Sequence, residues 1–471
     1  FAAGGFMNHF CPAYPAPRKT RTGIWKFFFS ARRSWLDSLY ERSYRMQMGE
    51  VHLPGVDLYM VNDPAVVKRV LQEESADFPK SALLGDALRP LLGDSVFTTN
   101  GATWQRQRDM MGPAFAQARL QVAFPVMKDA TDAMLARLDG LPDGAEHDIE
   151  VEMTFVTADI IFRTIFSKPL EGVDAHRVFD AFARFQALAP KLMLPAMYGV
   201  RWLVWPWDVW RSRRAAREIR GLLEALIRPR YEAHVRDGEG QDVSAPADIL
   251  AAFMAARDPE SGQPFSFDEL VDQVAMLFLA GHETSASALT WACYLLAEAP
   301  AVQSRVQAEV ASQLQGRSVE QSDLKPMALT WNVFRETLRL FPPVGFMVRE
   351  SAQTCPMRDK TVPQGASILI SPWLIQRHRQ WWQEPDAFNP DRYDDEATRA
   401  SLRQAYLPFG AGPRVCIGAA FALQEAVLIL SSLVGRYRLA AVPGHVPQPV
   451  GRLTIRSANG VRLTLHRRAV A

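Results

Sequence analysis

The sequence predicts a mainly α-helical fold with a smaller strand-rich part, on three observations. Helical patterns of apolar residues dominate about two hundred residues after position 100. One apolar run, residues 266–299, contains no proline and is long enough for a buried central helix. Strand-like segments lie towards the two ends of the chain. Because the strand-like segments come from both ends of the chain, we expect the two ends to be interwoven in one domain over residues 1–471.

The first hundred residues mix both kinds of element. A helical pattern over 31–48 precedes a strand-like region over 51–61, which Pro54-Gly55 interrupts. Asp63-Pro64 predicts the start of a further helix, with proline at its first position. The segment 81–100 is predicted to be a loop that carries several leucines.

A tryptophan-rich segment covers residues 188–214, with Trp202, Trp205, Trp207 and Trp210. Two interpretations are open. The segment is either a loop packed on the core, because monomers rarely expose apolar patches, or an exposed surface at a substrate entrance or a membrane.

The central helix has a defined start. Ser266 and Glu269 form the S-x-x-E capping pattern. The apolar run then continues to Ala299-Pro300, which corresponds to about 33 residues and roughly 50 Å. Since it is apolar on nearly every side, this helix is expected to be buried as the spine of the fold.

The C-terminal third returns to strands. Residues 361–371 predict a turn followed by a strand. Residues 452–467 predict two strands joined at Asn459-Gly460, a dipeptide typical of hairpin turns.

The composition excludes several classes of protein. The chain is 48% hydrophobic and 22% charged, which is typical of a globular protein and excludes disorder. A net charge of +2 indicates no strong field for nucleic acid. Four cysteines without a C-x-x-C pair exclude a disulfide scaffold and a zinc site, and they fit a reducing compartment. We therefore expect a cytoplasmic protein without a transmembrane anchor.

The strongest motif is the segment 409–418, FGAGPRVCIG. It fills every fixed position of F-x-x-G-x-R-x-C-x-G, with Phe409, Gly412, Arg414, Cys416 and Gly418. Its glycines permit tight turns and a close approach to a flat ligand. A helix that begins after the cysteine would stabilise a thiolate by its dipole and N–H groups.

This segment resembles the haem-binding signature of the cytochrome P450 family. The resemblance implies a cytochrome P450 fold with the long helix over the haem, and haem b as cofactor with Cys416 as its axial thiolate ligand. Such a ligand favours cleavage of the O–O bond. The resemblance also implies that Arg414 binds a haem propionate, and that Phe409 and Gly418 shape the cofactor site.

The segment 280–285, AGHETS, resembles the family's oxygen-activation motif. The resemblance implies that Ala280 leaves room beside the cofactor, that Glu283 relays protons and that Thr284 donates a hydrogen bond to dioxygen. We assign no role to His282.

Four further segments are similar to the family. Glu336 and Arg339 lie one helical turn apart, and Arg392 follows in a segment like the family's P-x-R-F; the three are implied to form a buried structural triad. Trp104 and Arg108 match W-x-x-x-R and are implied to hold a propionate. Arg349 lies where the family often places another propionate-binding arginine.

Resemblance to soluble bacterial-type members implies the reaction: insertion of one atom of dioxygen into a hydrophobic substrate such as a fatty acid, alkane, terpenoid or aromatic. Since no flavin or iron–sulfur segment is visible, electrons from NAD(P)H are expected through a separate ferredoxin and its reductase. Arg403 and Arg414 are candidates for docking an acidic partner. The implied substrate pocket contains Leu88, Val96, Phe97, Phe278, Val344, Phe346 and Met347.

Two alternatives remain open. One is a haem-thiolate enzyme that needs no electron partner, such as a peroxygenase, an isomerase or a dehydratase. The other is a non-catalytic haem sensor. The presence of both Glu283 and Thr284 favours the monooxygenase, because haem-thiolate relatives that need no electron partner usually lose this pair.

Overall fold

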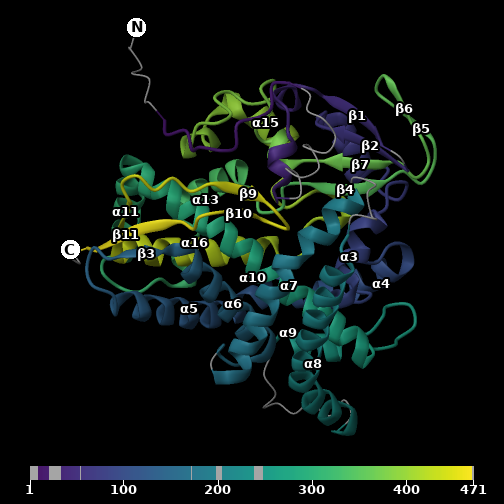
Figure 1. Ribbon diagram of the computed structural model, residues 1–471. Helices are drawn as coiled ribbons and strands as arrows, with labels where there is room; N and C mark the ends of the chain where they lie inside the picture. The colour runs from purple at the N-terminus through teal and green to yellow at the C-terminus, as the bar shows by residue number, and fades with distance from the viewer. Residues whose placement is uncertain are drawn as a thin grey trace.

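The computed structural model describes residues 9–20, 33–53, 55–170, 172–197, 204–237 and 248–468. Helices make up most of this part of the chain, and short strands form small sheets beside them (Figure 1). The predicted mainly α fold with a smaller β part is confirmed.

The helices follow one another through most of the chain. They are α2 (Pro64–Lys68), α3 (Ala82–Leu92), α4 (Gly101–Met111), α5 (Gln117–Asp139), α6 (Ile149–Phe166), α7 (Gly172–Met197), α8 (Pro206–Asp237), α9 (Ile249–Ala255), α10 (Phe267–Glu298), α11 (Pro300–Leu314), α12 (Gln321–Leu324), α13 (Ala328–Leu340), α14 (Pro372–Ile375), α15 (Arg399–Ala405) and α16 (Ala419–Arg436).

The strands are short. They are β1 (Met48–Leu53), β2 (Val56–Val61), β3 (Glu146–Asp148), β4 (Met347–Glu350), β5 (Cys355–Met357), β6 (Lys360–Val362), β7 (Ser367–Ile370), β8 (Tyr437–Ala441), β9 (Pro449–Gly451), β10 (Ile455–Ser457) and β11 (Arg462–Arg467). A four-stranded sheet has the order β1-β2-β7-β4, with β2 parallel to β7. A second sheet has the order β3-β11-β8.

The central helix α10 begins and ends where the sequence predicts. The Ser266 hydroxyl accepts from the Glu269 N–H (3.2 Å), and the Glu269 carboxylate accepts from the Ser266 N–H (2.8 Å). The helix ends before Pro300, and nearly all of its residues are buried. It packs against α6, α8, α13 and α16 (Figure 1), so it forms the spine to which the other elements attach.

Two further predictions near the N-terminus are confirmed. β1 and β2 form a hairpin that turns between Leu53 and Val56. Helix α2 starts at Pro64, and the Asp63 carboxylate accepts hydrogen bonds from the N–H groups of Ala65 and Val66.

The helix expected over 31–48 is wrong. The described part of this segment holds two 3₁₀ turns, Trp35–Ser38 and Glu41–Tyr44. Between them the backbone is extended, because Leu39 and Glu41 exchange main-chain hydrogen bonds with Arg18. This long-range pairing overrides the local helical pattern.

The loop expected over 81–100 is also wrong in its first half, which is helix α3. Leu88, Leu91 and Leu92 lie on one face of this helix and are almost fully buried. Their spacing of three and four residues is typical of a helix. Pro90 lies within the same segment, and a proline at an interior position argues against a helix in the sequence.

The C-terminal strands do not form the expected hairpin around Asn459-Gly460. β10 pairs with β9, whereas β11 pairs with β8 and β3. The turn instead joins two sheets, because the N–H of Val461 donates to Asp148 beside β3. The strand expected within 361–371 is β7, and its parallel pairing with β2 joins the N-terminal hairpin to the C-terminal third of the chain.

Helix α16 meets the length and hydropathy of a membrane span by composition alone. Most of its second half is buried in the protein core, where it packs against α10, α11 and α13. We therefore describe it as a core helix.

Candidate active site

A tight loop presents Cys416 at the start of α16. The N–H of Cys416 donates to the carbonyl of Phe409 (3.0 Å), and the N–H of Val415 donates to that of Gly412 (3.0 Å). Gly412 has a φ of +71°, and a Cβ there would lie 1.9 Å from the carbonyl oxygen of Leu71. Only glycine fits this position, so the loop shape depends on it.

The thiol of Cys416 is accessible although it lies deep in the fold. Burial raises its pKa, while the N–H of Gly418 and the charges of Arg108 and Lys80 lower it. The start of α16 and the two cations therefore offset part of the effect of burial, although the pKa of Cys416 stays raised, and the thiolate is the form that binds a metal.

Three arginines that the sequence singled out meet around this loop. Arg108 of α4 donates to the carbonyl of Val415 (3.0 Å). Arg414 lies over the ring of Trp104 (4.2 Å from its centroid). Arg349 on β4 is buried and donates to the carbonyl of Val348 (3.2 Å). All three belong to one cationic cluster, since the charges of Arg349 and Arg108 both act on Arg414.

Lys80 is a fourth cation, which sequence reasoning missed. Its backbone pairs with Arg349, and its ammonium donates to the carbonyl of Phe97 (2.9 Å). Burial lowers its pKa well below the ordinary value, and Arg414, Arg349 and Arg108 lower it further. No motif marks this lysine, because its role depends on a strand 269 residues further along the chain.

Asp109 and a Cys416 thiolate act on Arg108 of this cluster, but neither forms an ion pair with it. Within the described residues, no carboxylate forms an ion pair with Lys80, Arg108, Arg349 or Arg414. Burial lowers the pKa of Arg349 to about 10, and the Nη1 of Arg414 is buried without a partner. Buried cations without counter-charges are costly. The cluster therefore fits a bound group with two carboxylates beside the thiol, and haem with its two propionates is such a group.

The middle of α10 opens on one side. Ala280 is exposed and Thr284 is half-buried, although most of this helix is enclosed. Both lie on one face, four residues apart. The Thr284 hydroxyl donates to the carbonyl of Ala280 (2.6 Å), and a Cβ on Gly281 would press on Ile161 at 3.1 Å. The open face is therefore lined by small groups and one hydroxyl.

Glu283 lies next to this face, and its hydrogen bond goes to Thr454 and not to Thr284. It is buried, and its Oε1 accepts from the hydroxyl of Thr454 (2.8 Å). Burial raises the pKa of Glu283, while Arg456 and Thr454 lower it. The carboxyl group is therefore present, and its orientation is set by Thr454 in the turn between β9 and β10.

The three residues expected as a triad are in contact. Arg339 donates two hydrogen bonds to the Glu336 carboxylate (2.8 Å each), and Arg392 donates one (2.8 Å). Their side chains are 0%, 0% and 5% exposed for Glu336, Arg339 and Arg392. Burial alone would raise the pKa of Glu336, but the two cations lower it. Tyr393, in place of phenylalanine, adds a hydrogen bond to the same carboxylate (3.3 Å).

The triad supports the cysteine loop through one glutamine. Gln376 donates to the carbonyls of Leu338 and Arg339 and accepts from the N–H of Leu407 (2.8 Å). Leu407 precedes Phe409 by two residues, so α13 holds the start of the loop in place.

The residues expected in the substrate pocket are spread over several environments. Leu88 and Phe278 are enclosed in the core, and Val96 is nearly so. Phe346 packs edge-on against Trp35, Lys80 lies over Phe97, and a Cβ at Gly410 would lie 3.4 Å from the sulfur of Met347. Val344 is exposed. Their contact with substrate stays a prediction.

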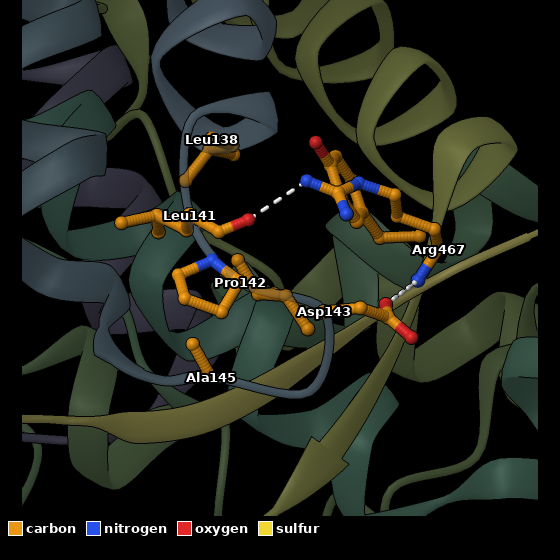
Figure 2. A pocket seen from close by; sticks show the side chains of 8 residues that line it. Leu138, Leu141, Pro142, Asp143, Ala145 and Arg467 are labelled. Atoms are coloured by element: carbon orange, nitrogen blue, oxygen red, sulfur yellow. Dashed lines mark hydrogen bonds between the residues drawn. The ribbon is translucent and has the colours of Figure 1, made fainter.

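The pocket in Figure 2 lies elsewhere, between the end of α5 and β11. Arg467 closes it: its main-chain N–H donates to Asp143, and its guanidinium donates to the carbonyl of Leu141 (Figure 2). The space left does not admit a water molecule, so this pocket has no place in the candidate site.

Two other polar residues near the site were also missed. Asn100 accepts from Arg414 (2.7 Å) and from the N–H of Lys80 (3.0 Å), so it links two cations. Glu425 on α16 is buried against Ser285 of α10, and burial raises its pKa to about 8. Neither residue has a sequence signal, since single polar residues in helices and loops are common.

Comparison with known proteins agrees with this geometry. The family model for cytochrome P450 matches residues 26–460. Cyclooctatin synthase of Streptomyces melanosporofaciens is 32% identical, with 86% of each chain covered. Pentalenene oxygenase of Streptomyces avermitilis is 30% identical, with 88% of this chain and 89% of that protein covered. The structure of retinoic acid bound cyanobacterial CYP120A1 has a TM-score of 0.78 at 24% identity, covers 90% of this chain and 92% of that chain, and shows the fold.

Proposed function

The chain belongs to the cytochrome P450 family, and from this premise we propose that it is a monooxygenase of a hydrophobic, terpenoid-like substrate. The proposed reaction takes a substrate C–H, dioxygen, NAD(P)H and one proton, and gives the alcohol, water and NAD(P)⁺. The observation that carries the proposal is the pair of Glu283 and Thr284 beside the open face of α10. An isomerase or a gas sensor has no need of such a pair.

The residues present fit haem, which the family implies. Cys416 would be its axial ligand, and Lys80, Arg108, Arg349 and Arg414 would bind its carboxylates. When bound, haem supplies the centre at which dioxygen is reduced and cleaved.

The protein's own groups handle protons and exclude water. The Thr284 hydroxyl is held by the Ala280 carbonyl, so its oxygen is fixed towards the open face. Glu283, buried one residue away, is the proton source. Most buried side chains on the other faces of α10 are apolar, which favours proton delivery through the few polar groups beside the open face.

The substrate class follows from the apolar lining and from the relatives. The candidate lining residues are aliphatic and aromatic. Of the classes considered, we favour a terpenoid, because terpenoid oxygenases are among the relatives and one is named for pentalenene.

Electrons are proposed to come from NAD(P)H through a separate ferredoxin and its reductase, in the cytoplasm. Arg403 on α15 is exposed and available to an acidic partner. Arg414 is not, because it is turned inward onto Trp104 and Asn100.

Replacing Thr284 by alanine is expected to uncouple dioxygen consumption from product, because the hydroxyl at the open face is lost. Product formed per NAD(P)H should fall by about tenfold, while the missing reducing equivalents appear as hydrogen peroxide. The measurement compares product, peroxide and NAD(P)H in one reaction. An unchanged ratio of product to NAD(P)H would refute the proposed role, and full activity with peroxide alone would favour the peroxygenase alternative.

A membrane is proposed as a further partner, through the start of α8. Trp205, Trp207 and Trp210 are 64%, 62% and 43% exposed, so the packed-loop interpretation of this part of 188–214 is not supported; Trp202 lies outside the described residues. Trp207 stacks on Trp210 (4.8 Å between ring centroids), beside an open groove of about 800 Å³. Its basic lining residues are Arg89, Arg213 and Arg217. Aromatic rings next to arginines suit an anionic bilayer surface.

The double variant Trp207→Ser/Trp210→Ser is expected to bind vesicles of phosphatidylglycerol at least about tenfold more weakly than the parent protein. Flotation of the holoprotein with vesicles measures this binding. Val235→Ser is the matched control, since Val235 is equally exposed near the other end of α8. If the parent protein does not bind, or the control loses as much, the proposed contact is wrong.

A further inference from the structure

Glu283 is held by one oxygen only. Its Oε1 accepts from the Thr454 hydroxyl at 2.8 Å, and its Oε2 is buried without a hydrogen-bond partner. Both side chains are enclosed, with Glu283 5% and Thr454 3% exposed. A buried carboxyl oxygen without a partner is unusual and needs an explanation.

The turn that carries Thr454 is held against α10 by hydrogen bonds. Thr454 lies between β9 and β10, next to Ile455. The carbonyl of Ile455 accepts from the Ser287 hydroxyl (2.6 Å) and from the Trp291 indole N–H (3.0 Å), both on α10. On the other side, the N–H of Ile455 donates to Pro343 (3.0 Å). The hydroxyl of Thr454 therefore has a fixed position relative to Glu283.

The neighbouring charged and titratable groups are engaged elsewhere. Arg456 on β10 is a cation whose charge acts on Glu283, and it donates to Glu150 and Thr154 of α6 (3.1 Å each). His282 is buried and neutral: burial lowers its pKa to about 4, one ring nitrogen contacts the carbonyl of Phe278 (2.6 Å) and the other contacts Gln186 (3.1 Å). Among the described residues, Thr454 is thus the group that contacts the Glu283 carboxyl directly.

We propose that Thr454 is a positioning residue for proton delivery, which holds the Glu283 carboxyl by Oε1 and leaves Oε2 free to exchange a proton with the open face of α10. The inference rests on the proposed function, because it assumes that Glu283 is the proton source. It adds a residue of the turn between β9 and β10 to a machinery otherwise found on α10.

The step moves one proton and no electron. The O–H bond at Oε2 breaks, and the proton passes to water at the face that carries Thr284. The carboxylate that remains keeps the hydrogen bond from Thr454 and takes a proton back from solvent. The hydroxyl therefore stabilises the charged form between two deliveries.

The test compares Thr454→Val, Thr454→Ser and Glu283→Gln in the holoenzyme. Valine has the shape of threonine without the hydroxyl, whereas serine keeps the hydroxyl and lacks the methyl group. Two readouts are used that need no identified substrate. They are the infrared C=O stretch of the protonated Glu283 carboxyl, assigned by its loss in Glu283→Gln, and dioxygen consumption against pH with NADPH, a ferredoxin and its reductase.

Thr454→Val should shift the infrared band to higher wavenumber, because the carbonyl oxygen loses its donor. It should also move the alkaline limb of the rate profile up by about one pH unit and lower the rate by roughly tenfold. Thr454→Ser should restore both readouts.

Three outcomes distinguish the positioning role of Thr454 from the role of Glu283 as proton source. If Thr454→Val matches the parent protein while Glu283→Gln is slow, the positioning role is wrong and the role of Glu283 stands. If valine and serine impair the enzyme equally, Thr454 acts by packing and the inference is wrong. If Glu283→Gln itself changes neither the band nor the rate, the proposed proton source is wrong and the inference falls with it.

Discussion

Replacing Cys416 by serine is expected to abolish monooxygenase turnover and to remove the thiolate-type Soret band of the reduced carbon monoxide complex. The loop from Phe409 to Gly418 places this sulfur at the start of α16, where the charges of Arg108 and Lys80 act on it. Serine has the same shape, but its hydroxyl does not ionise at neutral pH and cannot replace a thiolate ligand. The loss of turnover should be at least about a thousandfold, since the centre that reduces dioxygen is altered.

Cys11→Ser is the matched control. Cys11 is exposed and lies outside the loop, so its replacement should leave both the spectrum and the turnover unchanged. A thiolate-type band that survives in Cys416→Ser would show that another residue binds the iron.

Replacing Glu336 by glutamine is expected to cost about 3–5 kcal/mol of unfolding free energy. The carboxylate is fully buried between Arg339 and Arg392, and neutralising it leaves two buried cations without their counter-charge. Because Gln376 connects Arg339 to Leu407, the cysteine loop should also loosen, and the variant should retain less haem. Urea unfolding followed by circular dichroism, together with the haem content after purification, measures both effects.

The chain offers a control of the same chemistry at the surface. Glu396 pairs with Arg399 at 2.7 Å, also three residues apart, but both side chains are well exposed. Glu396→Gln should change the stability by less than about 1 kcal/mol. Equal unfolding midpoints for Glu336→Gln and Glu396→Gln would contradict the account of the triad.

The sequence predicted the parts of the fold whose signals are local. Capping at Ser266, the unbroken apolar run of α10 and the glycines before Cys416 each act within a few residues of their own position. Elements that depend on distant partners were mispredicted. The segment at Leu39 is extended because it pairs with Arg18, and Asn459-Gly460 joins two sheets because Val461 binds Asp148.

The same distinction holds for the site. Motif residues such as Arg108 and Arg414 could be found because the family pattern marks them, although their roles stay predictions. Lys80 could not, because it joins the cluster only through pairing with Arg349 on β4. Thr454 and Glu425 reach α10 from the C-terminal region, and no pattern along the chain connects them to it.

We propose that the protein inserts one atom of dioxygen into a hydrophobic substrate with electrons relayed from NAD(P)H. The test is mass spectrometry of the product that forms under ¹⁸O₂ in the presence of a ferredoxin and its reductase. The substrates are pentalenene and those terpenes, fatty acids and aromatics that shift the Soret band of the ferric protein. We expect one ¹⁸O atom in each new hydroxyl group and no product without NAD(P)H. Product that carries oxygen from water, or that forms without dioxygen, would contradict it.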